Sequence, residues 1–118
     1  MASEIVSINV GGKVFQTSPK TMCKYPNSKL SKMYQEGKKI KNRNFFLDED
    51  PKYFRVVLNF LRQDKVTLDE PNLFNGVFDL AKNLELNVLV KKLQRSEMGS
   101  VMAIVFFAII VFAIIVFA

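Results

Sequence analysis

The last 18 residues of the chain, residues 101–118, contain only valine, methionine, alanine, isoleucine and phenylalanine. All 17 basic and all 11 acidic residues lie before this segment. The part that remains has about 100 residues, which is near the common size of a single domain and enough to bury one core. We therefore expect a folded domain at residues 1–97, a linker at 98–100 and a hydrophobic segment at 101–118.

The hydrophobic segment has the minimum length for a membrane-spanning helix. At about 1.5 Å per residue its 18 residues reach roughly 27 Å, against about 30 Å of hydrocarbon in a bilayer. Lys91, Lys92 and Arg95 precede the segment, and by the positive-inside rule they would keep the folded domain in the cytoplasm. The sequence thus predicts a domain tethered to a membrane through residues 101–118. The alternative is an artificial or truncated tail on a cytoplasmic domain.

The supply of metal-binding and catalytic side chains is small. The chain has no histidine and one cysteine, Cys23, which excludes an intrachain disulfide, Cys/His zinc sites and histidine-based catalysis. The acidic run of Asp48, Glu49 and Asp50 resembles a metal site in composition. Because it directly precedes Pro51, it is better suited to helix capping or to a polar contact between subunits. We expect no enzyme activity, no cofactor and no bound metal.

A β-hairpin is predicted near the N-terminus. Apolar and polar residues alternate in residues 5–10, which is the period of a half-buried strand, and residues 13–17 are rich in strand formers. Between these runs, Gly11 and Gly12 suit a tight turn whose two central positions need positive φ. The glycines do not form a phosphate-binding loop, because Lys13 is followed by valine instead of serine or threonine.

Helix-start signals occur where a capping residue precedes a proline or an amphipathic run: Ser18 with Pro19, Asn27 with Ser28, and Asp50 with Pro51. The second of these helices is expected to end at Gly37. Further strands are expected at residues 44–48 and 65–68, and further helices at about 71–80 and 83–95. The pattern predicts an α+β fold, with a small mixed sheet and surrounding helices, followed by a hydrophobic C-terminal helix.

A concentration of basic residues lies between Lys24 and Arg43, with Glu36 as the one acid among them. A nucleic-acid-binding surface is one interpretation. No stacking aromatic residues interleave with residues 38–43, however, and no recognition-helix pattern is present nearby. A solvated helix face and loop is the favoured interpretation, and binding to nucleic acid is not expected.

Several short motifs occur in a characteristic order: VSINVGG at residues 6–12, FQTS at 15–18, PNSKL at 26–30, FLDEDP at 46–51 and FRVVLNFLR at 54–62. Together they resemble the potassium-channel tetramerisation type of BTB/POZ domain. That domain occurs in voltage-gated potassium channels and in the KCTD adaptor proteins. The resemblance covers residues 4–95 and implies a BTB fold whose copies assemble into a closed ring of four or five subunits.

The resemblance also implies which residues form the contact between neighbouring subunits. Polar residues of the first strands, of the acidic segment before the third helix and of that helix contribute in the family. Carried over to this sequence, the candidates are Asn9, Thr17, Asp48, Asp50, Asn59 and Arg62. A closed ring needs a head-to-tail contact, so two different surfaces of each subunit take part.

The sequence also departs from the family pattern. Glu49 stands where the family has an arginine between two acids, and Asn83 and Leu84 stand where a late motif has two aromatics. The zinc ligands of some channel subfamilies are absent. The function implied is homo-oligomerisation, with co-assembly with related BTB domains also open. The alternatives are a KCTD-like adaptor for a cullin ubiquitin ligase and a truncated or modifying potassium-channel subunit, since one uniformly apolar segment cannot form a pore.

Overall fold

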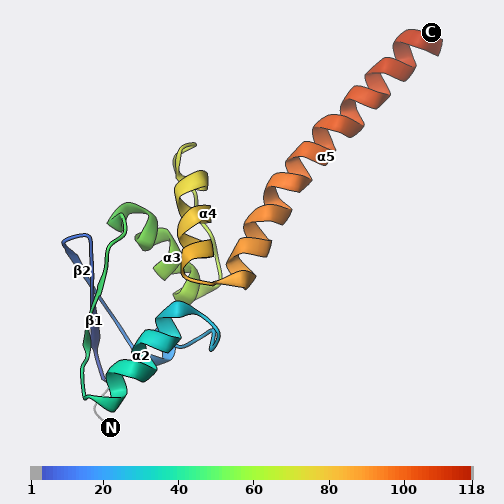
Figure 1. Ribbon diagram of the computed structural model, residues 1–118. Helices are drawn as coiled ribbons and strands as arrows, with labels where there is room; N and C mark the ends of the chain where they lie inside the picture. Colours follow the sequence, from blue (N-terminus) through green and yellow to red (C-terminus); the bar gives the residue numbers. More distant parts are fainter. Residues whose placement is uncertain (1–3, 118) are drawn as a thin grey trace.

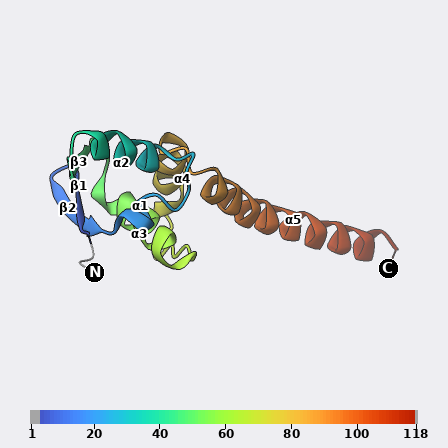
Figure 2. The same ribbon diagram turned by 90° about the horizontal axis from the view of Figure 1, so that it is seen from below.

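The computed structural model of the protein describes residues 4–117, apart from the side chains of residues 96–103. A small sheet lies at one end of the molecule, helices pack against one side of it, and the C-terminal helix projects from the other end (Figures 1 and 2). The elements form the α+β arrangement that the sequence predicts.

The sheet has three strands, β1 (Val6–Val10), β2 (Lys13–Thr17) and β3 (Asn44–Leu47), in the order β2-β1-β3. The predicted hairpin is confirmed, because β1 pairs antiparallel with β2 and places Ser7 opposite Gln16. Gly11 and Gly12 form its turn with φ angles of 55° and 103°. On its other side β1 pairs in parallel with β3, so the sheet is mixed.

Two helices begin at the capping residues that the sequence indicates. Helix α1 (Pro19–Met22) follows Ser18, whose hydroxyl accepts a hydrogen bond from the Thr21 backbone N–H at 3.2 Å. Helix α2 (Lys29–Lys39) follows Ser28, which caps the Ser31 N–H in the same way at 3.2 Å. Each cap satisfies an N–H group that has no partner inside its helix.

The expected end of α2 at Gly37 is wrong, because the helix continues to Lys39 and buries Gly37. A Cβ atom at this position would lie 2.7 Å from Cε1 of Phe45, so the aromatic ring of β3 packs directly on the glycine. Gly37 is therefore a site of close packing between α2 and β3. The sequence around Gly37 predicts a helix end because helix propensity depends on neighbouring residues only, and the Phe45 ring lies outside that neighbourhood.

Replacing Gly37 by alanine should destabilise the domain even though alanine favours a helix by about 1 kcal/mol over glycine. We expect a net loss of about 1–2 kcal/mol in the free energy of unfolding, because the added methyl group must displace the Phe45 ring. Urea unfolding of the variant measures this loss. In a Phe45→Ala background the same substitution should cost less, because only the Asn42 carbonyl, 3.0 Å from the added Cβ, then remains close to it. A loss of equal size in both backgrounds would contradict the packing explanation.

Helix α3 (Pro51–Gln63) is the central helix of the domain. It is capped by Asp50, whose Oδ1 accepts the Lys52 N–H at 2.9 Å, and it ends at Asp64, whose φ of 58° is left-handed. Its broad apolar face, including Phe54 and Phe60, is buried against the sheet and the other helices. The strand expected at residues 65–68 is wrong, because that segment is not a strand and Val66 and Leu68 pack against the core instead.

Helix α4 (Leu73–Asn83) and helix α5 (Asn87–Phe117) complete the fold. The sequence predicted one helix from Asn83, but the chain turns between α4 and α5 at Glu85, which has a φ of 56°. The N-terminal part of α5 closes the core with Leu89 and Leu93, which are 0% and 2% exposed. The core therefore spans residues 6–93.

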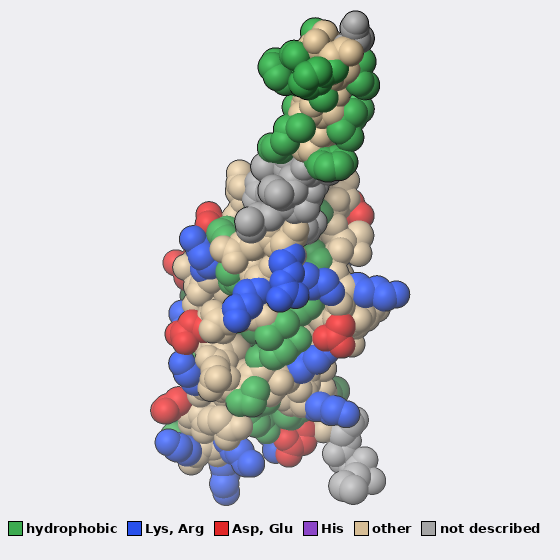
Figure 3. All heavy atoms as spheres, turned by 90° about the vertical axis from the view of Figure 1, so that its right-hand side faces the viewer, with side chains coloured by type: hydrophobic (Ala, Val, Ile, Leu, Met, Phe, Trp, Pro, Cys, Tyr) green, Lys and Arg blue, Asp and Glu red, His purple; other side chains and the backbone are tan. Residues whose placement is uncertain are grey.

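Beyond the core, α5 extends away from the domain, and its far end carries apolar side chains on its surface (Figure 3). The expected linker at 98–100 lies within the bounds of α5, and its side chains fall outside the described residues. Among the residues that the structure describes, no helix is both long and apolar enough to cross a membrane. The predicted membrane tether through residues 101–118, a segment that is itself only partly described, is therefore not supported.

Candidate assembly site

Within the part of the chain that the structure describes, one face of the sheet has no layer packed on it. Val6, Ile8 and Val10 point toward the helices and are at most 1% exposed. Because side chains alternate along a strand, the intervening residues and their cross-strand partners point the other way. We name this surface the outer sheet face, and it consists of Ser7, Asn9, Val14, Gln16, Asn44 and Phe46.

The outer sheet face combines neutral polar groups with exposed apolar ones. Val14 and Phe46 are 58% and 60% exposed, and they flank Asn9 on either side in the pairing register. None of the six residues is charged, although Lys, Arg, Asp and Glu make up 24% of the chain. Depletion of charge together with exposed apolar area is the composition found at the centre of protein–protein interfaces.

Three of the predicted contact residues lie toward the turn end of the sheet. Asn9 belongs to the outer sheet face, and its Oδ1 accepts the Gly12 N–H at 2.8 Å, which holds the turn. Asp48 and Asp50 lie exposed in the loop between β3 and α3. That loop is held against the hairpin turn, because the Gly11 N–H donates to the Leu47 carbonyl at 3.0 Å.

The other three predicted residues lie along β2 and α3. Thr17 is half-buried at the end of β2, on the side of the sheet that faces the helices. Asn59 and Arg62 are exposed on α3, and the Arg62 guanidinium donates to the Gln16 carbonyl at 2.7 Å. The structure thus places Arg62 beside the outer sheet face. The six candidates do not form one cluster, because Asn9 is part of the outer sheet face and the others lie in the loop after β3, at the end of β2 and on α3.

Sequence reasoning missed the apolar members of the surface, Val14 and Phe46. The signal that could have revealed them is the strand alternation itself, which places Val14 on the same face as Asn9 and Gln16. A strand at residues 44–48 does not by itself determine which way Phe46 points, and its outward direction follows only from the parallel register of β3 with β1. The residues of the outer sheet face can therefore be identified only when it is known which strands pair.

Comparison with known protein families matches residues 6–95 to the BTB/POZ domain. The chain belongs to the BTB/POZ domain family, in its potassium-channel tetramerisation type. The BTB/POZ domain-containing protein KCTD17 of Homo sapiens is 36% identical over 90 residues, which cover 73% of this chain and 29% of the relative. KCTD5 of Bos taurus is 33% identical over 94 residues, covering 75% and 40%. KCTD21 of Mus musculus is 33% identical over 100 residues, covering 81% and 38%.

The chain therefore spans between 29% and 40% of the length of these relatives. What the relatives share with it is the BTB/POZ domain, since the matched residues 6–95 contain the whole core described above. Among the described residues, no group of three or more His, Cys, Asp or Glu side chains lies close enough to bind a metal ion.

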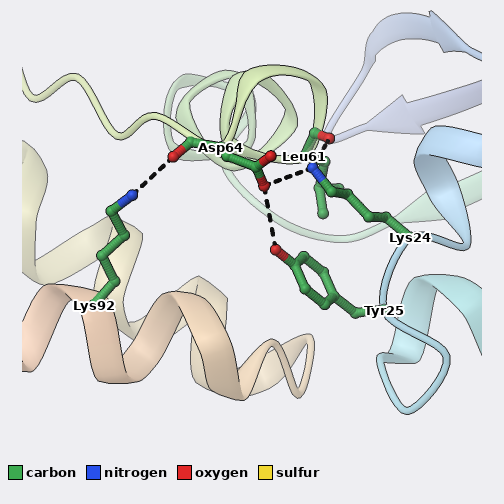
Figure 4. A network of polar contacts seen from close by, with 5 residues as sticks. All are labelled: Lys24, Tyr25, Leu61, Asp64 and Lys92. Atoms are coloured by element: carbon green, nitrogen blue, oxygen red, sulfur yellow. Dashed lines mark hydrogen bonds and ion pairs between the residues drawn. The ribbon is translucent and has the colours of Figure 1, made fainter.

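A polar network joins three parts of the BTB/POZ domain at the C-terminal end of α3 (Figure 4). The Lys24 ammonium donates to Oδ1 of Asp64 at 2.6 Å and to the Leu61 carbonyl at 3.2 Å. From α5, the Lys92 ammonium donates to the backbone carbonyl of Asp64 at 2.7 Å. Tyr25 completes the network with a 3.5 Å contact from its hydroxyl to Oδ1 of Asp64. Asp64, at the end of α3, is thereby linked both to the loop after α1 and to α5.

This network makes the acid sensitivity of the domain testable. The hydrogen bond from Lys24 holds the pKa of the Asp64 carboxyl below its usual range, against the opposing effect of desolvation. A group with a depressed folded-state pKa stabilises the fold above its unfolded pKa, and that stabilisation is lost as the pH falls through the folded pKa. Because Asp64 is 65% exposed, solvent screening keeps the effect modest.

Asp64→Asn should therefore lower the urea midpoint at pH 7, and the difference from the wild type should shrink as the pH is lowered toward about 2 through the folded-state pKa of the carboxyl. Urea titrations of the wild type and the variant across this pH range measure the difference. Asp79→Asn is the matched control, because Asp79 is exposed and forms no ion pair within the described residues. A midpoint difference that persists undiminished at pH 2 would show that the carboxylate charge is not the cause.

Three of the seven basic residues between Lys24 and Arg43 are paired with acids from other elements. Lys24 contacts Asp64, Lys32 contacts Glu85 at 2.8 Å, and Arg43 contacts Glu4 at 3.1 Å. The hydrogen bond from Lys32 also lowers the pKa of the Glu85 carboxyl. These three ion pairs are formed with acids of the same chain, which lowers the net positive charge available for an extended phosphate backbone and favours a solvated surface over a nucleic-acid site.

Proposed function

We propose that this chain is a homo-oligomerisation module whose BTB/POZ domains assemble into a closed ring of four or five subunits. Membership of the potassium-channel tetramerisation type supports the proposal, and the observation that carries it is the outer sheet face. Val14 and Phe46 expose most of their surface to water in the single subunit. A neighbouring subunit that covers them removes this apolar area from solvent.

The contact is head-to-tail, so the outer sheet face meets a different surface of the next subunit. We assign Asn9, Asp48 and Asp50 to the part of the contact near the hairpin turn. Thr17, Asn59 and Arg62 form the part beside β2 and α3. Glu49 lies between the first two acids and makes this part of the contact more acidic than in relatives with arginine there. We infer a domain in the cytoplasm that works by self-assembly, without catalysis.

The solution mass of residues 1–97 tests this function. This segment contains the complete core at residues 6–93 and omits the apolar end of α5. Light scattering over a concentration series from about 1 to 200 µM should give a constant mass of four or five subunits. A monomer throughout this range would contradict self-assembly as the intrinsic function of the domain.

An adaptor function, in which the domain binds a cullin ubiquitin-ligase scaffold, is a second candidate that one observation favours. A groove of about 440 Å³ lies between α2 and β3, lined by apolar groups of Met33, Ile40 and Phe45. Ile40 is 76% exposed at its edge. A large exposed apolar side chain beside an apolar groove is a typical anchor for a protein partner.

Binding of purified cullin N-terminal domain to the ring, measured by calorimetry, tests the adaptor function. We expect Ile40→Asp to weaken such binding by at least tenfold while the mass of the ring stays constant. Lys39→Asp is the control, because Lys39 neighbours Ile40 in sequence but does not line the groove. Absence of binding to the wild-type ring would remove the adaptor function and leave the oligomerisation function standing.

A further inference from the structure

A second cleft, distinct from the groove beside Ile40, lies at the end of the sheet away from the hairpin turn. Its volume is about 440 Å³, and it is bounded by the start of β1, the end of α2 and the residues before β3. The lining side chains are Glu4, Tyr34, Lys38, Lys41, Asn42 and Arg43. We propose that this cleft binds a phosphate group, because three cations and two neutral polar groups converge there around a single carboxylate.

The backbone around the cleft is held by hydrogen bonds from several elements. The Asn42 N–H donates to the Gly37 carbonyl at 2.8 Å, and the Ser7 N–H of β1 donates to the Arg43 carbonyl at 3.0 Å. Lys41 has a left-handed φ of 56°, and its N–H donates to the Lys38 carbonyl at 3.3 Å. Lys38 therefore projects from the last turn of α2, and Lys41 and Arg43 are presented by a fixed turn between α2 and β3.

Within the chain, a carboxylate already occupies part of the cleft. Glu4 accepts a hydrogen bond from the Arg43 guanidinium at 3.1 Å and another from the Tyr34 hydroxyl at 3.3 Å. Burial and the adjacent Glu4 charge raise the pKa of the Tyr34 hydroxyl, so it stays protonated and able to donate. The Arg43 guanidinium and the Tyr34 hydroxyl thus already hold one carboxylate of the chain, and the same two donors are available to another anion.

The single carboxylate of Glu4 does not neutralise the three cations that line the cleft, so the cleft keeps an excess of positive charge. Lys38 and Lys41 form no ion pair within the described part of the chain. A phosphate monoester carries about −1.5 to −2 charges at pH 7 and three acceptor oxygens, which a carboxylate does not supply. It can take the Glu4 position on the Arg43 fork and also contact the two lysines.

Glu4 is consequently a competitor for the same position. Its side chain is 45% exposed, so it can turn into solvent when a phosphate enters. Removing its charge should strengthen phosphate binding, whereas for a purely structural ion pair the loss of Glu4 would leave phosphate affinity unchanged. A stronger binding on loss of Glu4 therefore indicates competition for this position, and the two double-lysine variants below separate a local site from a general positive charge.

The experiment is calorimetric titration of the full chain with inorganic pyrophosphate and, separately, with a phosphoserine peptide. We expect Lys38→Gln with Lys41→Gln to weaken binding at least tenfold and Glu4→Gln to strengthen it severalfold. Lys20→Gln with Lys39→Gln removes the same charge from residues outside the cleft and should change affinity less than twofold. Binding of pyrophosphate identifies free phosphate compounds as ligands, and binding of the peptide alone identifies a phosphorylated protein.

Two results would overturn the proposal. One is the absence of binding of either probe at 50 mM salt. The other is an equal loss of affinity in the two double-lysine variants, which would show that only net charge matters. Neither result bears on the ring, because the cleft residues are not among those assigned to the subunit contact.

Discussion

Phe46→Asp should convert the ring into monomers while leaving the subunit folded. Phe46 is 60% exposed, so its removal takes little from the core of a single subunit. In the proposed ring the same position is covered by a neighbour. A buried charge without a partner there costs about 3–5 kcal/mol, which corresponds to at least a roughly hundredfold weaker association.

Light scattering of residues 1–97 carrying this substitution measures the loss of mass, and circular dichroism shows whether the monomer remains folded. Val88→Asp is the matched control, because Val88 is 50% exposed on α5 and lies outside the outer sheet face. We expect the control to retain the mass of the wild type. An unchanged mass for Phe46→Asp would exclude the outer sheet face from the contact and require another surface of the BTB/POZ domain.

Phe54→Ala should produce the largest loss of stability of any single substitution considered. Phe54 is 0% exposed, and its ring meets that of Phe15 edge to face with centroids 5.1 Å apart. Truncating such a residue removes its burial and leaves a cavity, at a cost of about 3–5 kcal/mol. For a domain of this size that is a large part of the total free energy of unfolding.

Urea unfolding at a fixed protein concentration measures this loss, since association also contributes to the stability of an oligomer. Phe54→Leu is the control, because leucine retains most of the buried apolar volume and should cost less than half as much. A loss below about 1 kcal/mol for Phe54→Ala would mean that the site collapses around the missing ring and that α3 is not the centre of the core.

Local signals in the sequence predicted the starts of the first three helices correctly, but not the start of α5. Ser18, Ser28 and Asp50 cap α1, α2 and α3 because a short polar side chain and the N–H groups two or three residues later are close in any such helix. The hairpin is equally local, since Gly11 and Gly12 determine its turn. These elements need no information about the rest of the fold.

The predictions of secondary structure are wrong where residues distant in the sequence determine the local structure. Gly37 continues its helix because Phe45 packs on it, and residues 65–68 have strand-forming side chains but no strand beside them. The candidate contact residues came from family resemblance alone, and their role remains a prediction. Val14 and Phe46 could be assigned to one surface only after the pairing of β1 with both neighbours was known.

The pairing of β1 also has a consequence for the order of events during synthesis. Ser7 meets Gln16 across a two-residue turn, but it meets Asn44 only after α1 and α2 have been made. The hairpin can form early, whereas the parallel pairing must wait for a longer chain closure. Until then one edge of β1 is unpaired and able to pair with other chains. Dilution and rapid completion of translation should therefore favour soluble protein over aggregates in cells and in refolding.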